Sequence, residues 1–145
     1  MERCRALGDD SVYREIALLK KLEHPNIVKM LEVINDPVSD HIYIVLELVQ
    51  GGPLCATKSK TDTVTPDVVF VWFRDIVAGV SYLHEQLVVH RDLKLENCLL
   101  TSDGHVKLCD FGFSHVFRDD EDGMLKCVDE ERAPSLLCLL AGVLL

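Results

Sequence analysis

The sequence predicts a domain of the α+β class, in which helices and short antiparallel strands occupy separate stretches of the chain. Residues 12–22 and 66–86 carry apolar side chains at the spacing of a helix face. Residues 27–34 and 41–48 are rich in β-branched side chains, and turn-forming residues separate them. Residues 98–108 have the pattern of a β-hairpin around a short polar turn. A chain of 145 residues, 48% of them hydrophobic, can bury the core of one domain.

The first predicted helix covers residues 12–22 and ends before Pro25. The residue that precedes a proline is disfavoured in the helical region, so the chain must leave the helix near His24. Residues 1–11 show no periodic pattern and are expected to be disordered. The apolar face of the helix comprises Val12, Ile16, Leu19 and Leu22.

The strands at residues 27–34 and 41–48 are expected to pair antiparallel, because Asn, Asp, Pro and Ser residues between them favour a turn. The sequence Gly51-Gly52-Pro53 then interrupts the strand pattern, and residues 58–65 are polar. Residues 49–65 are therefore expected to link two parts of the domain.

The second predicted helix has a clear start signal. Thr65 is a good N-cap, Pro66 suits the first helical position, and Asp67 favours the positive end of the helix dipole. The helix should run to about Gln86. Its broad apolar face predicts a largely buried helix and comprises Val69, Trp72, Phe73, Ile76, Val80 and Leu83.

Two polar motifs flank the predicted hairpin. The first is His90-Arg91-Asp92-Leu93-Lys94-Leu95-Glu96-Asn97, and the second is Asp110-Phe111-Gly112. The hairpin should fold Asp110 back beside Asn97, so that oxygen atoms of both side chains can reach one metal ion.

These motifs resemble the catalytic loop and the metal-binding DFG motif of protein kinases. Lys94, two residues after Asp92, is similar to the serine/threonine class of that family rather than to the tyrosine class. Residues 12–54 are most similar to calcium/calmodulin-dependent protein kinase kinases, whereas Leu95-Glu96 looks more like the AMP-activated kinase branch. The resemblance implies a truncated protein-kinase-like fold with the αC helix, part of the small lobe, the hinge, the αE helix, the catalytic loop and the DFG hairpin.

The resemblance also implies a role for each motif residue. Asp92 would be the catalytic base, Lys94 would contact the transferring phosphoryl group, and Asn97 and Asp110 would bind Mg²⁺. Phosphoryl transfer gives a protein little covalent work, so one carboxylate and a few oxygen ligands meet its needs. A hydrophobic spine without acid–base chemistry would comprise Leu19, Met30, His90 and Phe111.

The contacts to ATP implied by the resemblance come from other stretches. Glu47 and Val49 would belong to the hinge that binds adenine, with Leu46 as the gatekeeper and Leu99 packed beneath the adenine. Glu15, on the first helix, would pair with a lysine of the third small-lobe strand. By itself, Glu15 could equally be one more exposed helix charge.

Several parts of a protein kinase domain are absent from the sequence. There is no glycine-rich loop, and the first lysine is Lys20, so no lysine precedes Glu15. Glu15 is thus expected to be exposed or to be buried unpaired, and the small lobe is expected to keep two strands of five. The activation segment diverges after Phe117, with no Ala-Pro-Glu motif. We hypothesise that the apolar run at residues 136–145 covers part of the surface left open.

This comparison divides the chain into five parts. They are a disordered N-terminus (1–11), a small-lobe remnant (12–48), the hinge and linker (49–65), a large-lobe core (66–117) and a divergent tail (118–145).

Charge and cysteine content limit the expected partners. The net charge of −9 and the lack of a basic stripe argue against nucleic acid. The six cysteines form no CxxC pair and there is no N-terminal signal peptide, so free thiols in the cytoplasm or nucleus are expected. Residues 136–145 are too few to span a bilayer. No basic amphipathic helix supports calmodulin binding.

Two functions remain open. The first is a serine/threonine protein kinase that transfers the γ-phosphate of ATP to hydroxyl groups of a protein substrate with Mg²⁺. The second is a catalytically inactive kinase fragment that acts as a binding module or has no function. The missing glycine-rich loop and lysine favour the second, and the intact motifs favour the first.

Overall fold

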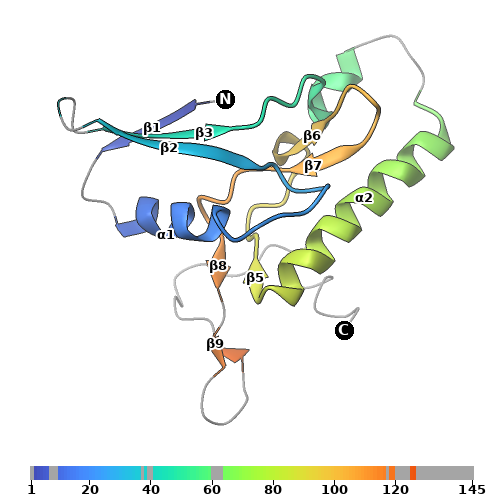
Figure 1. The fold of residues 1–145 in the computed structure, drawn as a ribbon. Coiled ribbons are helices and arrows are strands. Elements are labelled where there is room, and N and C mark those ends of the chain that lie inside the picture. The colour runs from blue at the N-terminus through green and yellow to red at the C-terminus, as the bar shows by residue number, and fades with distance from the viewer. Residues whose placement is uncertain are drawn as a thin grey trace.

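The computed structural model describes most of the chain up to Val116 and two short pieces beyond it. These residues form an α+β fold, which confirms the predicted fold class. A three-stranded antiparallel sheet lies over helix α1 (Asp10–Leu19), and a hairpin separates these elements from the long helix α2 (Pro66–Glu85) (Figure 1). The described residues are 2–6, 10–36, 38, 41–59, 64–116, 118–119 and 125–126.

Strand β1 (Glu2–Ala6) pairs antiparallel with β3 (His41–Leu46), from Glu2 opposite Val45 to Ala6 opposite His41. The predicted disorder of residues 1–11 is therefore wrong for this strand, and the small sheet has three strands rather than two. In Glu-Arg-Cys-Arg-Ala, polar and apolar residues alternate only from Arg3 to Ala6, which is the shortest run that indicates a strand. Its strand conformation rests on backbone pairing with β3, which a local pattern does not reveal.

Strand β2 (Met30–Asp36) pairs with the other side of β3, which gives the sheet order β1-β3-β2. Side chains of β3 alternate in burial, and Ile42, Ile44 and Leu46 face the core. The antiparallel pairing of the two predicted strands is confirmed, although β2 begins at Met30 instead of residue 27.

Residues 26–28, which precede β2, lie beside the hairpin strand β7 (Val106–Leu108). The Val28 N–H donates to the Leu108 carbonyl at 2.9 Å, and the Leu108 N–H donates to the Asn26 carbonyl at 2.8 Å. The buried Asn26 side chain donates to the Val106 carbonyl at 2.8 Å. Because these buried polar groups satisfy one another, they fix the small sheet to the hairpin.

Helix α1 ends at Leu19, three residues before its predicted end, and Lys20 and Lys21 follow in a turn. Its buried face includes Val12 and Ile16, as the periodicity predicts. One hydrophobic core joins this face to β3, the hairpin and Phe111.

Helix α2 begins at the predicted Pro66 and ends one residue before Gln86. It is much less buried than predicted, because Leu83 is 1% exposed while Val69 is 50% and Phe73 is 64% exposed. The helix carries apolar side chains around more than one face, and the described residues cover only the face that packs on the hairpin. Gly79 permits this close packing, since a Cβ atom there would lie 3.0 Å from the Leu108 side chain.

The predicted hairpin forms from β6 (Cys98–Leu100) and β7, with Gly104 in the turn at a φ of +88°. Strand β4 (Gly52–Pro53) pairs with the free side of β6, and β5 (Val88–Val89) pairs with β8 (His115–Val116). The hairpin therefore stands between the segment that follows β3 and the two polar motifs.

Short elements complete the described chain. The predicted polar loop at residues 58–65 begins inside the 3₁₀ helix η1 (Leu54–Ser59). Of the predicted tail, only β9 (Arg118–Asp119) and β10 (Leu125–Lys126) are described, and they pair with each other. The hypothesis about residues 136–145 lies outside the described residues.

Candidate active site

Three of the predicted site residues form one hydrogen-bonded cluster in the loop between β5 and β6. The Lys94 ammonium donates to Asp92 Oδ2 at 2.7 Å. The Asn97 amide Nδ2 donates to the same oxygen at 3.1 Å and to the Asp92 carbonyl at 2.8 Å. Asn97 is buried at the end of the short helix η2 (Leu95–Asn97), whereas the Asp92 side chain is 27% exposed. The cluster thus fixes a carboxylate that solvent can still reach.

Asp110 lies next to this cluster, as the hairpin predicts. The Cys109 N–H donates to the Asn97 carbonyl at 2.9 Å, which sets the start of the second motif against the end of the first. The hydrogen bond to Asp92 raises the pKa of Lys94, and the negative charge of Asp110 acts in the same direction. Lys94 therefore stays protonated between two carboxylates.

His90 packs instead of titrating at neutral pH. Its ring lies 5.0 Å from the ring of Phe111, and Nε2 lies 3.0 Å from the Cys109 carbonyl. Burial lowers the pKa of His90, although the Cys109 hydrogen bond and the charges of Asp110 and Asp92 oppose this. The neutral ring with its proton on Nε2 fits this contact, in keeping with the predicted spine role.

The predicted hinge residues lie between β3 and β4. The Glu47 N–H donates to the Lys29 carbonyl at 2.9 Å, and the Lys29 N–H donates to Glu47 Oε1 at 2.7 Å. Among the described residues, none forms a hydrogen bond with the backbone of Val49. Leu46 and Leu99, the predicted apolar contacts of adenine, are each 8% exposed.

Lys107 belongs to the same region, although it was not among the predicted site residues. Its ammonium group donates to Glu47 Oε1 at 2.7 Å. The only sequence signal is its place between two hydrophobic strand residues, Val106 and Leu108, which alternation turns toward the core.

Glu15 lies on α1 and is 5% exposed. The expectation that it is either exposed or buried unpaired is wrong, because Glu15 is buried and has an interaction partner. Burial of a carboxylate is tolerated when other groups stabilise its charge.

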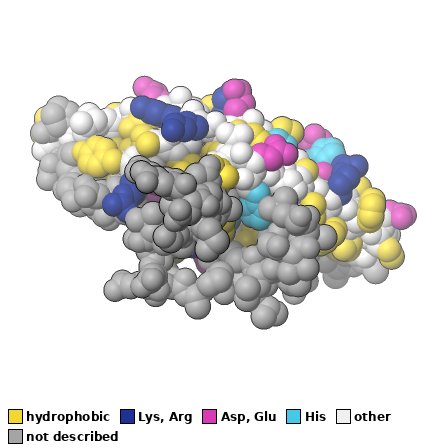
Figure 2. Space-filling view, turned by 90° about the horizontal axis from the view of Figure 1, so that it is seen from below, with side chains coloured by type: hydrophobic (Ala, Val, Ile, Leu, Met, Phe, Trp, Pro, Cys, Tyr) yellow, Lys and Arg dark blue, Asp and Glu magenta, His cyan; other side chains and the backbone are white. Residues whose placement is uncertain are grey.

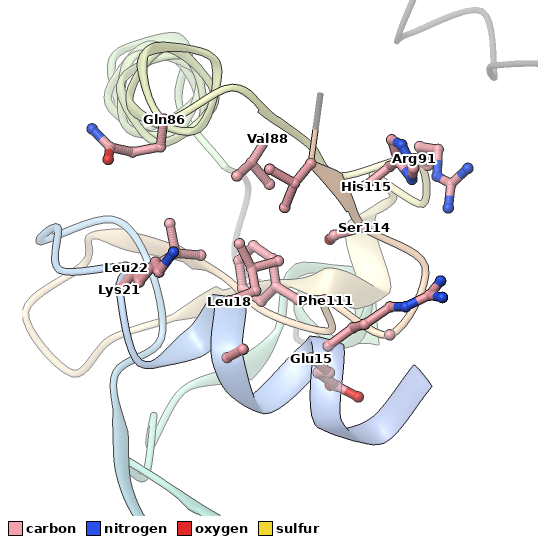
Figure 3. Close-up of a pocket in the computed structure, with 14 residues that line it drawn as sticks. Glu15, Leu18, Lys21, Leu22, Gln86, Val88, Arg91, Phe111, Ser114 and His115 are labelled. Carbon is pink, nitrogen blue, oxygen red and sulfur yellow. The ribbon is translucent and has the colours of Figure 1, made fainter. Parts of the chain in front are cut away.

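A cavity of about 640 Å³ lies between α1 and Phe111 (Figure 3). Leu18 and Phe111 face its interior, whereas Arg91 and His115 lie at its side toward β8. Its lining includes Glu15 but not the other predicted site residues. The cavity is therefore beside the cluster and not at it.

Three of the six cysteines are free thiols, as predicted. Cys55, Cys98 and Cys109 form no disulfide. Burial raises the pKa of Cys98 to about 12, so its thiol is not ionised at neutral pH.

The described residues lack two further features. No helix among them is long and apolar enough to cross a bilayer. They also contain no group of three or more His, Cys, Asp and Glu side chains that could hold a metal ion.

The fold and the two motifs define a protein kinase domain. The sequence model of the protein kinase domain matches residues 2–137, so this chain belongs to the protein kinase family. Its relatives identify it as part of a serine/threonine protein kinase domain.

Three relatives illustrate the similarity. A probable serine/threonine-protein kinase of Dictyostelium discoideum is 48% identical over 118 residues, which cover 81% of this chain and 16% of the relative. Serine/threonine-protein kinase GRIK2 of Arabidopsis thaliana is 43% identical over 91% of this chain and 33% of its own length. The calcium/calmodulin-dependent protein kinase kinase of Caenorhabditis elegans is 44% identical over 73% of this chain and 19% of its own. The chain thus spans a third or less of these relatives.

Proposed function

We propose that this chain carries the phosphoryl-transfer site of a serine/threonine protein kinase, which uses ATP and Mg²⁺ to phosphorylate a protein hydroxyl group. The observation that carries the proposal is the fixed Asp92 carboxylate, held through Oδ2 by Lys94 and Asn97. Neither bond uses Oδ1, and the side chain is 27% exposed, so this oxygen can accept the proton of a substrate hydroxyl.

Lys94 and Asn97 have distinct parts in this proposal. Lys94 stays protonated and can turn from Asp92 toward the negative charge of the transferring phosphoryl group. Asn97 commits Nδ2 to Asp92, which leaves Oδ1 as an oxygen ligand. The donor set at the site is thus neutral amide and carboxylate oxygen, which suits a hard cation.

Mg²⁺ would be held by Asn97 and Asp110. It usually keeps water and phosphate oxygens as further ligands, so two protein ligands fit it even though no larger acidic group is described. When bound, the ion neutralises charge on the phosphates of ATP. For adenine, the backbone of Val49, which has no hydrogen bond among the described residues, offers a donor and an acceptor near Glu47. Leu46 and Leu99 would supply the apolar contacts.

We place the chain in the calcium/calmodulin-dependent protein kinase kinase lineage, in the cytoplasm or nucleus. Support comes from the similarity of residues 12–54 and from the relative of Caenorhabditis elegans. We propose no calmodulin or nucleic-acid partner for this chain. We keep residues 12–117 as the partial kinase domain, although the family match begins at residue 2 and ends at residue 137.

The second candidate is a fragment without catalytic activity. The 145 residues by themselves contain no glycine-rich loop and no lysine before Glu15, and each group that stabilises transition-state charge typically contributes ~10²–10³ in rate. Such a fragment could still bind nucleotide through the residues that remain.

Thermal unfolding of the whole chain with and without ATP and Mg²⁺ tests the nucleotide site. A ligand that binds the folded state raises its stability, so the melting temperature should rise in the wild type. The rise should be lost in D110N, which weakens the cation ligand. D103N is the matched control, because Asp103 is exposed in the hairpin turn and it should keep the full rise.

Phosphate transfer to a peptide substrate then separates the two candidates. D92N should keep the thermal shift and lower turnover by about 10²–10⁴-fold. A wild type that binds ATP without turnover supports the inactive module. A wild type with no thermal shift contradicts both the enzyme and a nucleotide-binding fragment.

A further inference from the structure

We propose that Lys107 is a positioning residue, which fixes the adenine-contacting segment at residues 47–49 through its ion pair with Glu47. This inference rests on the proposed nucleotide site, because it assigns a device that holds one half of that site in place. Lys107 itself would not touch the nucleotide.

Glu47 is held by three bonds that converge from two directions. Its N–H donates to the Lys29 carbonyl at 2.9 Å, and its Oε1 accepts the Lys29 N–H at 2.7 Å. The same Oε1 accepts the Lys107 ammonium at 2.7 Å. The first two bonds tie Glu47 to the chain that enters β2, and only the third ties it to the hairpin.

The pair is partly shielded from solvent. The Lys107 side chain is 20% exposed and the Glu47 side chain is 28% exposed. An ion pair in this environment is screened less than one on the open surface, and its short contact is charge-assisted. By contrast, the pair between Lys29 and Glu23 has side chains that are 57% and 81% exposed, although its distance is also short at 2.9 Å.

Lys107 projects from a rigid support. Its neighbours Val106 and Leu108 are both 0% exposed, and Leu108 exchanges backbone bonds with residues 26 and 28. In the hairpin register Lys107 lies opposite Leu99, the predicted adenine contact. The strand that carries Lys107 also leads directly into Cys109 and Asp110.

The Lys107 side chain thus adds a link between the two halves of the proposed site, beside backbone bonds such as that from the Gly51 N–H to the Leu100 carbonyl at 2.8 Å. The adenine contacts follow β3, whereas Asn97 and Asp110 flank the hairpin. ATP must reach both halves at once, so their relative position sets how well it binds. Loss of the Lys107 bond should let residues 47–49 move relative to the hairpin, which weakens binding before it affects the chemical step.

The test compares K107M with K29M in the whole chain. Methionine keeps most of the aliphatic stem of lysine and removes the charge in both variants. K29M retains the Lys29 main-chain bonds to Glu47, so it controls for the loss of one positive charge near that residue. Calorimetric titration with MgADP should show binding about three- to tenfold weaker in K107M and within twofold of the wild type in K29M.

The double variant E47Q/K107M adds a check on the mechanism. If the two residues act as one pair, E47Q/K107M should bind MgADP no more weakly than whichever of the single variants E47Q and K107M binds it more weakly. Additive losses would show that Lys107 acts through another residue and would overturn the pairing. Binding by K107M that equals or exceeds that of the wild type would also overturn the proposal.

Hydrogen exchange without nucleotide makes the test independent of the proposed function. The Glu47 amide is protected by its bond to the Lys29 carbonyl, and it should exchange faster in K107M but not in K29M. A wild type that fails to bind MgADP would refute the nucleotide site. Unchanged exchange in K107M would refute the positioning role whatever the binding result.

Discussion

Two of the three non-glycine residues with positive φ in the described part of the chain lie in the two motifs. Among the described residues, the non-glycine positions with positive φ are Leu87, Arg91 and Asp110, at 57°, 62° and 69°. Such conformations typically cost of order 1–3 kcal/mol each and persist where surrounding contacts enforce them. At Arg91 one such contact is clear, because its Nε donates to the Phe113 carbonyl at 2.7 Å. The contacts around the motifs therefore set the direction of their side chains.

His90 should make stability depend on pH. Its pKa lies below the ordinary value of 6.5 in the folded state because it is buried, so the unfolded chain binds more protons below pH 6.5. The free energy of unfolding should therefore fall as pH drops below about 6.5 and level off below the folded pKa. Denaturant unfolding at several pH values from about 5 to about 8 measures how the free energy of unfolding changes.

H90F supplies the comparison for this prediction. Phenylalanine keeps the packing against Phe111 but cannot titrate. The free energy of unfolding of the wild type minus that of H90F should therefore decrease toward low pH. The pKa of His24 is also lowered by burial, so the variant should retain part of the slope. Parallel curves for the two proteins would contradict the assignment.

Among single residues, those that belong to one motif could be predicted from the sequence, whereas those brought together by contacts between distant elements could not. Asp92, Lys94 and Asn97 lie within six positions of one another, so their proximity follows from a single loop. Lys107 and Glu47 are 60 positions apart, and only the stacking of β3 and the hairpin brings them together. The burial of Glu15 could not be judged, because the periodicity of a helix does not show which other residues pack against it.

Among the elements, the hairpin depends on a buried carboxylate of α2. Asp75 Oδ2 accepts His105 Nδ1 at 2.8 Å and the Val106 N–H at 3.1 Å, and Oδ1 lies 3.1 Å from Arg74 Nη2. Burial by itself raises the pKa of Asp75, but these hydrogen bonds together lower it. Asp75 therefore holds the hairpin as an ionised group.

D75A should destabilise the chain by about 2–3 kcal/mol, because it leaves the Val106 N–H and the His105 ring without their acceptor. R74A is the matched control, since the Arg74 side chain is 57% exposed and its loss should cost less than about 1 kcal/mol. Urea unfolding of both variants measures the two values. A D75A variant as stable as R74A would show that solvent replaces these bonds at no cost.

The boundaries of helices and strands were predicted best where the local sequence signals are strong. The start of α2 matches because Pro66 suits the first helical position, although the Thr65 side chain at the N-cap forms no capping hydrogen bond. The hairpin matches because a polar turn separates two apolar runs. Strand β1 has neither signal and forms through its partner alone. Burial of α2 was predicted wrongly, because periodicity shows that a face is apolar and not that another element covers it.

In the whole molecule, the described residues leave an apolar stripe of α2 in solvent. Phe70 is 69% exposed, Phe73 is 64% exposed and Val77 is 39% exposed, at the i, i+3, i+7 spacing of one helix face. Hydrophobic side chains gather at the end of the molecule where α2 begins (Figure 2). Contiguous exposed apolar surface promotes association.

The hypothesis that residues 136–145 cover part of the surface left open, to which this stripe belongs, remains a prediction, because those residues lie outside the described part of the chain. Deletion of residues 136–145 tests this hypothesis. If the run covers the stripe within one chain, deletion should increase self-association and protease sensitivity. Unchanged protease resistance would argue against such cover.

Substitution of the stripe itself should weaken self-association of the whole chain. Each phenylalanine buried in a contact contributes roughly 1.5–3 kcal/mol, so F70S/F73S should raise the dissociation constant of self-association at least about tenfold. Sedimentation velocity over a range of concentrations measures this constant. V38S is the control, since Val38 is 92% exposed on a separate turn and belongs to no stripe. Because both phenylalanines are mostly exposed, the double variant should keep the melting temperature of the wild type. Equal association of F70S/F73S and the wild type would mean that chains contact one another through a surface other than α2.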